Sequence, residues 1–190
     1  LVFLECSNEI AGFQIGQFLI TRGHRRVCFV HYHRDTPWAK GRFEGLARAF
    51  RLAGMPDGVR QSRLFDVDAP SADRTEAAEN EWLDGLLATG ATAWVTGDDS
   101  LATRFILPLL ERHGLVPGSD ISLMGFNDQA DAFFERLTSY NFNSDGLASA
   151  MLFYAQFPGR RRRPRRKGHD PVKLTGYIVD RGSVAMIVRN

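Results

Sequence analysis

The stretch Ile121–Asp128, with the sequence ISLMGFND, decides the fold, because a short apolar run ends there in two polar residues. Val27–Val30 and Ala93–Val95 are two further short apolar runs. Runs of this length are typical of strands buried on both faces of a parallel sheet. The sequence therefore predicts three central strands, with weaker strand candidates at Gln61–Phe65 and Leu1–Leu4.

Amphipathic helices are predicted between these strands. Phe43, Leu46 and Phe50 recur at helical spacing, and charged side chains occupy the opposite face. The same spacing recurs in the segments 78–86 and 101–109. Regular alternation of strand and helix predicts an α/β fold with a doubly wound parallel sheet.

Glycines mark the predicted helix ends. Each follows a helix at the position where a left-handed cap is needed: Gly23, Gly54, Gly90 and Gly114. Pro108 interrupts the predicted helix around Leu101–Leu109, and a proline there is expected to kink that helix or to begin a new one.

The alternation changes after Phe126. A strand is predicted at Leu137–Phe142, a helix at Ser144–Gln156 and a last strand at Val172–Val179. The charge of the arginine-rich run Arg160–Lys167 would suit nucleic-acid binding. It contains no aromatic residues, which favours a solvated loop over residues 158–171.

Composition restricts the class of protein. The chain has 190 residues, of which 44% are hydrophobic and 24% charged, as in ordinary soluble globular proteins. A net charge of +2 argues for neither nucleic acid nor membrane, and no apolar run approaches the roughly 20 residues that cross a bilayer. Two cysteines are too few for a disulfide framework, which fits a reducing cytoplasm.

A binding site is expected at the carboxyl ends of the strands, where open parallel sheets hold their ligands. Polar clusters follow four predicted strands there: 31–42, 66–69, 97–99 and 127–128. Asp99 directly precedes a helix and is predicted to cap it. For Asp98 and Asn127, helix capping and ligand contact both stay open. Arg42 lies at the start of a helix, where the helix dipole does not stabilise a positive charge, and this position favours a role in ligand contact. Trp38 and Tyr32 offer flat apolar faces to a sugar ring.

Six segments, in order along the chain, resemble motifs of LacI/GalR-type transcription repressors. They are Gly23–Val27 (GHRRV), Arg42–Gly45 (RFEG), Thr96–Ala102 (TGDDSLA), Leu115–Asp128 (LVPGSDISLMGFND), Leu137–Ser139 (LTS) and Arg181–Val184 (RGSV). The chain departs from the common pattern in having Asn127 for an aspartate and Asp98 for an asparagine. One extra residue separates Asp99 from Gly114, and the arginine-rich run has no counterpart.

The resemblance implies a cytoplasmic transcriptional regulator, with a two-lobed effector domain that resembles periplasmic binding proteins. It implies a small-molecule effector such as a sugar, a homodimer, and DNA contact only through a head that precedes Leu1. Residues 1–137 and 172–187 would form the C-terminal lobe, and 138–157 a strand and helix of the other, mostly absent lobe. Leu147, Met151 and Tyr154 on that helix are expected to lack a full partner within the chain.

Site residues carried over by position are Arg42, Asp98 and Asn127, with Thr36, Trp38 and Asp66 or Val67 as weaker candidates. Phe133 and Phe134 are either core residues or part of the dimer interface. No catalytic residue and no cofactor is predicted. No metal is predicted either, because His31 and His33 have no third metal-ligating residue near them in the sequence.

Two other functions remain open. Acids at several strand ends, such as Asp66, Asp98 and Asp128, suit a magnesium-dependent phosphotransfer or hydrolase domain, but no nucleophile motif or phosphate-binding glycine pattern accompanies them. A periplasmic sugar-binding protein has the same fold and ligand, and differs from a regulator in what precedes the chain.

Overall fold

The computed structural model describes residues 4–31, 36–64, 75–157 and 172–187. The strands are β1 (Leu4–Glu5), β2 (Val27–His31), β3 (Val59–Arg63), β4 (Ala93–Thr96), β5 (Ser122–Phe126), β6 (Thr138–Asn141), β7 (Val172–Lys173) and β8 (Tyr177–Val179). The helices are α1 (Asn8–Thr21), α2 (Pro37–Leu52), α3 (Glu76–Leu87), α4 (Asp99–Leu101), the π-helix η2 (Ala102–Ile106), α5 (Leu107–Arg112), α6 (Ala130–Phe134) and α7 (Ser144–Gln156).

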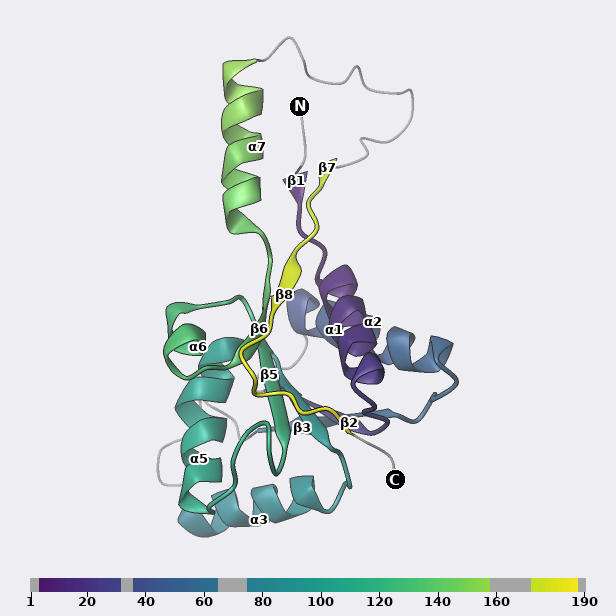
Figure 1. The fold of residues 1–190 in the computed structure, drawn as a ribbon, viewed down its shortest axis with the longest axis vertical. Coiled ribbons are helices and arrows are strands. Elements are labelled where there is room, and N and C mark those ends of the chain that lie inside the picture. The colour runs from purple at the N-terminus through teal and green to yellow at the C-terminus, as the bar shows by residue number, and fades with distance from the viewer. Residues whose placement is uncertain (1–3, 32–35, 65–74, 158–171, 188–190) are drawn as a thin grey trace.

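Six of the described strands form one sheet, which we call the main sheet, in the order β3-β2-β4-β5-β6-β8 (Figure 1). The pairings from β3 to β6 are all parallel, and β8 runs antiparallel to β6 at the edge. The prediction of an α/β fold built on a parallel sheet is therefore confirmed.

Helices cover both faces of the main sheet, as a doubly wound sheet requires. Val27, Phe29 and Val95 face α1 and α2 in one apolar core. The alternate strand residues Cys28 and Val30 face α3, η2 and α5 in the other. The central strands are buried on both sides, which explains why their sequences are continuously apolar.

The glycines end helices as predicted. Gly23, Gly54, Gly90 and Gly114 have φ values of 87°, 77°, 66° and 66°, in the left-handed region that only glycine adopts without strain. His24 follows the first of them and is buried, with Nδ1 2.8 Å from Thr92 Oγ1 and Nε2 3.2 Å from the carbonyl oxygen of Ala185. Burial lowers the pKa of His24, so the neutral imidazole joins the turn after α1 to the residue before β4 and to the C-terminal segment.

Pro108 begins a new helical segment rather than a kinked continuation. The π-helix η2 directly precedes α5, and Pro108 is the second residue of α5. A proline lacks the N–H that a continuous α-helix needs, and a π-helix accommodates one extra residue. A π-helical turn at this place has the capacity to hold the one extra residue that the resemblance implies between Asp99 and Gly114.

Two strand predictions are wrong. The last strand is not continuous over 172–179: β7 pairs with β1, whereas β8 pairs with β6 in the main sheet. Gly176 lies in the break, where a Cβ atom would stand 2.1 Å from the carbonyl oxygen of Asn141. The strand after Leu137 does not belong to another lobe either, because β6 continues the parallel ladder beside β5.

α7 and the small sheet of β1 and β7 both lie beyond the carboxyl edge of the main sheet (Figure 1). All thirteen residues of α7 are described and none is buried, in agreement with the expectation that its apolar face finds no full partner in the chain. Met151 is 58% exposed and Leu152 62%. Within the described ranges, no helix combines the length and the apolar character that crossing a membrane requires.

Candidate functional site

Arg42 lies at the carboxyl edge of the main sheet and joins three elements. Its Nε donates to Oδ1 of Asn8 at 2.9 Å, Nη1 to the carbonyl oxygen of Gly97 at 2.5 Å, and Nη2 to Oδ1 of Asn127 at 3.0 Å. These partners belong to the start of α1, the end of β4 and the end of β5. The structure thus brings Arg42 and Asn127 into direct contact, with Asp98 close enough to act on the guanidinium charge.

Three aromatic rings surround the Arg42 guanidinium. Its Cζ lies 4.6 Å from the ring centre of Phe126 and 4.9 Å from those of Trp38 and Phe142, within the range of cation–π contacts. Only 7% of Arg42 is exposed, and this burial lowers its pKa to about 10, while the charge of Asp98 opposes the shift. Arg42 is therefore cationic at neutral pH.

Asn8 was missed by sequence reasoning, and close packing of α1 against α2 places it. A Cβ atom on Gly12 would stand 2.0 Å from the carbonyl oxygen of Arg42, and one on Gly45 2.0 Å from that of Glu9. Only glycines allow the two backbones to approach this closely. Glycines four residues apart in both helices, at 12 and 16 and at 41 and 45, are a signal that could have revealed this contact.

The structure assigns the helix cap to Asp98, for which capping and ligand contact were both open, and not to Asp99. Asp98 is the N-cap of α4, and its Oδ1 accepts from the backbone N–H of Leu101 at 2.8 Å. The prediction that Asp99 caps this helix is wrong, because its carboxylate points inward and is fully buried. Gly125 leaves the space for it, since a Cβ atom there would stand 2.2 Å from Oδ1 of Asp99.

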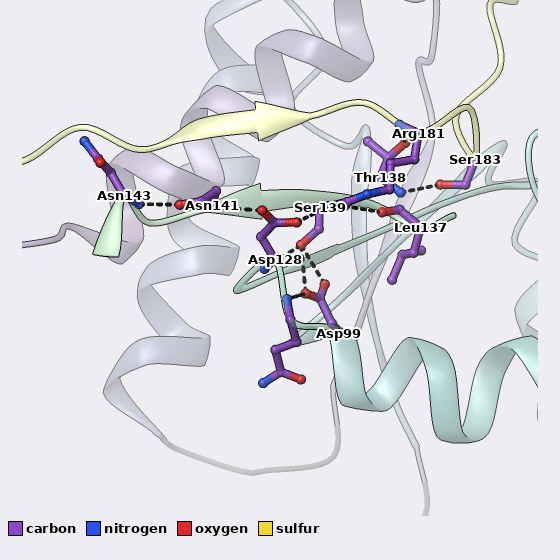
Figure 2. A network of polar contacts seen from close by, with 10 residues as sticks. Asp99, Asp128, Leu137, Thr138, Ser139, Asn141, Asn143, Arg181 and Ser183 are labelled. Carbon is purple, nitrogen blue, oxygen red and sulfur yellow. Dashed lines mark hydrogen bonds and ion pairs between the residues drawn. The ribbon is translucent and has the colours of Figure 1, made fainter. Parts of the chain in front are cut away.

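The buried Asp99 carboxylate accepts hydrogen bonds from two neighbouring segments. Ser139 Oγ donates to it at 2.7 and 2.9 Å, and the backbone N–H of Gln129 donates at 2.9 Å (Figure 2). Burial raises the pKa of Asp99 to about 6, because desolvation outweighs these hydrogen bonds, and the nearby charges of Asp128 and Asp98 add to the rise. Asp99 thus joins the end of β4 to β6 and to the turn after β5.

The turn after β5 has a constrained backbone. Asn127 and Asp128 have φ values of 102° and 51°, a region that asparagine and aspartate tolerate better than most residues. Three successive backbone N–H groups, from residue 127 to 129, are each held. Their acceptors are, in order, the Tyr140 carbonyl oxygen at 2.9 Å, Ser139 Oγ at 3.0 Å and the Asp99 carboxylate at 2.9 Å.

Asp128 connects this turn to two other segments through its side chain (Figure 2). Oδ1 accepts from Nη2 of Arg181 at 2.5 Å, and Oδ2 accepts from Nδ2 of Asn141 at 2.8 Å. Arg181 also donates to the carbonyl oxygen of Leu137 at 2.9 Å. Sequence reasoning found Asp128 and Arg181 as motif residues but did not predict that they form an ion pair.

The remaining predicted site residues fall into two groups. Thr36 precedes α2, and in the part of the chain that the structure describes its buried Oγ1 has no hydrogen-bond partner. Trp38 contacts Arg42, as given above. The other predicted residues lie outside the described ranges: Tyr32, His33, Asp66, Val67 and Arg160–Lys167.

Phe133 and Phe134 form an exposed aromatic pair on α6. They are 66% and 75% exposed, and their ring centres stand 5.6 Å apart in an edge-to-face arrangement. They are therefore not core residues in this chain. Their place in a dimer interface stays a prediction.

A hollow of about 560 Å³ lies away from this site, between α5 and the segment around Arg181. Its walls are formed by Leu107, Glu111, Gly114–Pro117, Glu135, Arg136 and Arg181–Ser183. None of Arg42, Asp98 and Asn127 lines it. The described residues also contain no group of three histidines, cysteines or acids that could hold a metal ion.

Comparison with known proteins identifies the class of domain. The model of the periplasmic binding protein-like domain family matches residues 17–184. The chain belongs to this family. The matched residues include Arg42, Asp98 and Asn127, whereas Asn8 precedes the matched range.

Curated relatives are transcription repressors. The HTH-type transcriptional repressor PurR of Glaesserella parasuis is 27% identical over 117 residues, which are 62% of this chain and 33% of that protein. The arabinose metabolism transcriptional repressor of Geobacillus stearothermophilus is 27% identical over 125 residues, 66% of this chain and 34% of its own length. The matched region is therefore about a third of the length of these relatives.

Solved structures share the fold. A sugar-binding transcriptional regulator of the LacI family from Escherichia coli, complexed with phosphate, superposes with a TM-score of 0.70 at 20% identity, over 97% of this chain and 63% of that one. A LacI-family regulator from Enterococcus faecium with bound ribose gives a TM-score of 0.69 at 21% identity, over 97% and 66%. At this level of identity the likeness establishes the α/β architecture alone.

Proposed function

We propose that this chain is the ligand-sensing domain of a DNA-binding transcriptional repressor, and that it binds rather than transforms a small neutral molecule such as a sugar. The observation that carries the proposal is the arrangement around Arg42. One buried guanidinium joins three strand and helix ends at the edge of the sheet where this architecture binds ligands. Membership of the binding-protein family and the repressor relatives support the same conclusion.

The chemistry of the site favours a hydroxyl-rich, uncharged ligand. A guanidinium has five N–H donors, and three of those of Arg42 are already used, which leaves one on Nη1 and one on Nη2. Asp98 and Asp99 offset the positive charge, so the site offers little net attraction to an anion. Trp38 and Phe142 supply the flat apolar faces on which a sugar ring packs.

We infer that α7, β1 and β7 begin the second lobe of the effector domain, and that a ligand held between the lobes favours one closure state. A difference in affinity between two states is sufficient to shift their populations. The ribose bound to the Enterococcus faecium regulator makes a pentose a reasonable first candidate. DNA contact would belong to a segment outside this chain, the dimer to the face of Phe133 and Phe134, and the whole protein to the cytoplasm.

A thermal-shift screen tests the ligand. The protein is melted with D-ribose, L-arabinose, D-glucose, D-galactose, adenine and guanine in turn, with Mg²⁺ and inorganic phosphate as separate additions. We expect at least one sugar to raise the melting temperature and Arg42→Ala to lose that response. Arg48→Ala is the matched control, since Arg48 lies on the same helix and pairs with Glu9 at the surface. A rise with Mg²⁺ and with none of the sugars would instead favour the phosphotransfer reading.

A further inference from the structure

We propose that Asp128, Asn141 and Asn143 form a relay that fixes the direction of α7 and of the β7–β8 connection relative to the ligand edge of the main sheet. The relay begins one residue after Asn127, which contacts Arg42, and it ends in the parts of the chain that stand beyond that edge. The idea that a ligand acts on α7 through this relay rests on the proposed function. The idea that the relay positions α7 does not depend on any ligand.

The first link leaves the site through Asp128. Its carboxylate is largely buried and accepts from Arg181 on one oxygen and from Asn141 on the other. Because the backbone of Asp128 is held by Ser139 in a left-handed conformation, the carboxylate has little freedom to follow Asn141 if that residue moves. Asp128 is therefore a fixed point from which Asn141 is held.

The second link runs from Asn141 to Asn143 across the exit of β6. Oδ1 of Asn141 accepts from the backbone N–H of Asn143 at 2.6 Å, while its Nδ2 is directed at Asp128 (Figure 2). Both the oxygen and the nitrogen of the Asn141 side-chain amide are thus engaged in hydrogen bonds. The orientation of this side chain decides where the chain turns towards α7.

The third link divides at Asn143, which adopts a left-handed conformation with φ 59°. Its Oδ1 accepts from the backbone N–H of Gly146 at 3.0 Å and so caps the first turn of α7. Its Nδ2 donates to the carbonyl oxygen of Thr175 at 3.3 Å, in the segment between β7 and β8. One residue therefore sets both segments that leave the main sheet.

Packing against the described part of the chain covers little of α7, and only Gly146, Leu147, Ala150 and Tyr154 are half-buried. None of its residues is buried, and it stands clear of the main sheet in Figure 1. A helix with so little buried surface takes much of its direction from its attachment, and here the attachment is the hydrogen-bonded exit from β6.

Distances between two spin labels test the relay in the full chain without a ligand. Labels are placed on cysteines introduced at Arg51 on α2 and Ala155 on α7, both exposed, in a Cys6→Ser background. Cys28 is fully buried, and burial raises the pKa of its thiol to about 12, so it stays unlabelled. The unaltered relay is expected to give one narrow distance distribution.

Asn141→Leu and Asp128→Asn are each expected to broaden that distribution. In Asp128→Asn the remaining oxygen stays with the charged Arg181, so the new amide N–H₂ faces the N–H₂ of Asn141 and the link is lost. The double variant should be no broader than either single one, because all three cut the same connection. Arg22→Gln, which removes an ion pair with Asp180 on the same C-terminal segment, is the control and should keep the narrow distribution.

The NMR signal of the Arg42 Nε–H group separates positioning from general loosening. In Asn141→Leu it should keep its chemical shift, because the acceptor of Nε–H is Asn8 on α1, and because Asn127, which accepts from Nη2, is held by the Tyr140 carbonyl independently of Asn141. A narrow distance distribution in both Asp128→Asn and Asn141→Leu would overturn the relay, as would a moved Arg42 signal in Asn141→Leu. Failure of every sugar to stabilise the protein would refute the proposed ligand and leave this result unchanged.

Discussion

The backbone of Gly12 lies directly against the carbonyl group of Arg42, with room for a hydrogen atom and not for a methyl group. A Cβ atom on Gly12 would stand 2.0 Å from that oxygen, well inside the van der Waals contact distance. This contact between α1 and α2 holds Asn8 within reach of the Arg42 side chain. The position of Asn8 at the carboxyl edge of the main sheet therefore depends on a packing contact in the neighbouring helix layer.

Gly12→Ala is expected to lower the free energy of unfolding by about 1–3 kcal/mol, because the two helices must separate to admit the methyl group. Gly85→Ala is the matched control in α3, where a Cβ atom would meet nothing within 4 Å. It should raise the free energy of unfolding by about 0.5–1 kcal/mol, since alanine loses less backbone entropy in a helix. Urea denaturation measures both, and equal stability of Gly12→Ala and the wild type would contradict the contact.

Asp99 should make stability depend on pH in the sense opposite to that of a salt-bridged acid. Its pKa is raised from 3.8 to about 6 in the folded chain, so it favours folding fully below pH 3.8 and loses this contribution as the pH rises through 6. A shift of this size corresponds to about 3 kcal/mol. The free energy of unfolding of the wild type, minus that of Asp99→Asn, should fall between pH 4 and pH 7. A difference that grew with pH would show that Asp99 is stabilised as a carboxylate.

Phe133 and Phe134 are predicted to hold two copies of the chain together. Replacing both with serine should convert a dimer into a monomer in sedimentation velocity and leave the melting temperature of the monomer unchanged, because both rings are exposed. Phe153→Ser on α7 removes an exposed ring from a different surface and serves as the control. A wild-type chain that sediments as a monomer, or a dimer that only Phe153→Ser dissociates, would rule out this face.

Leu152→Glu on α7 should change the free energy of unfolding by less than about 0.5 kcal/mol, because the leucine is exposed and packs against no core. Leu46→Ala in α2 should cost about 2–5 kcal/mol, because that leucine is fully buried. Chemical denaturation of the two variants in parallel makes the comparison. If Leu152→Glu lowered the free energy of unfolding by more than about 1 kcal/mol, then Leu152 would be packed in solution against a surface that it does not contact in the structure.

The layers of the fold were predictable because they follow from local patterns. Apolar runs as short as Val27–Val30 are typical of strands buried on both faces, and the glycines after the helices mark positions that other residues adopt with strain. The break at Gly176 was not predictable in this way. Its apolar flanks read as one strand, and the separation arises because Asn141 of another strand approaches the glycine.

The candidate site was predictable in its residues more than in their roles. Strand ends placed Arg42 and Asn127 at one edge, and the structure joins them. The choice between Asp98 and Asp99 as the helix cap depended on the space left by Gly125, which lies on another strand. Phe142 reaches Arg42 only through tertiary packing, and no spacing along the chain indicates it. Asn8 reaches Arg42 through the contact between α1 and α2, for which the glycines spaced four residues apart are the only sequence signal.

The π-helical turn at Ala102–Ile106 has a consequence for reading related proteins. A π-helical turn holds one residue more than the matching stretch of α-helix, so it can take up an added amino acid without displacing the acids before it or Gly114 after it. In an alignment with a relative whose helix is regular, the positions after this turn are therefore shifted by one residue relative to the positions before it. Any transfer of residue roles between such proteins must put its gap within this turn, and a gap placed in the loop at Gly114 would assign every contact of α5 to the wrong neighbour.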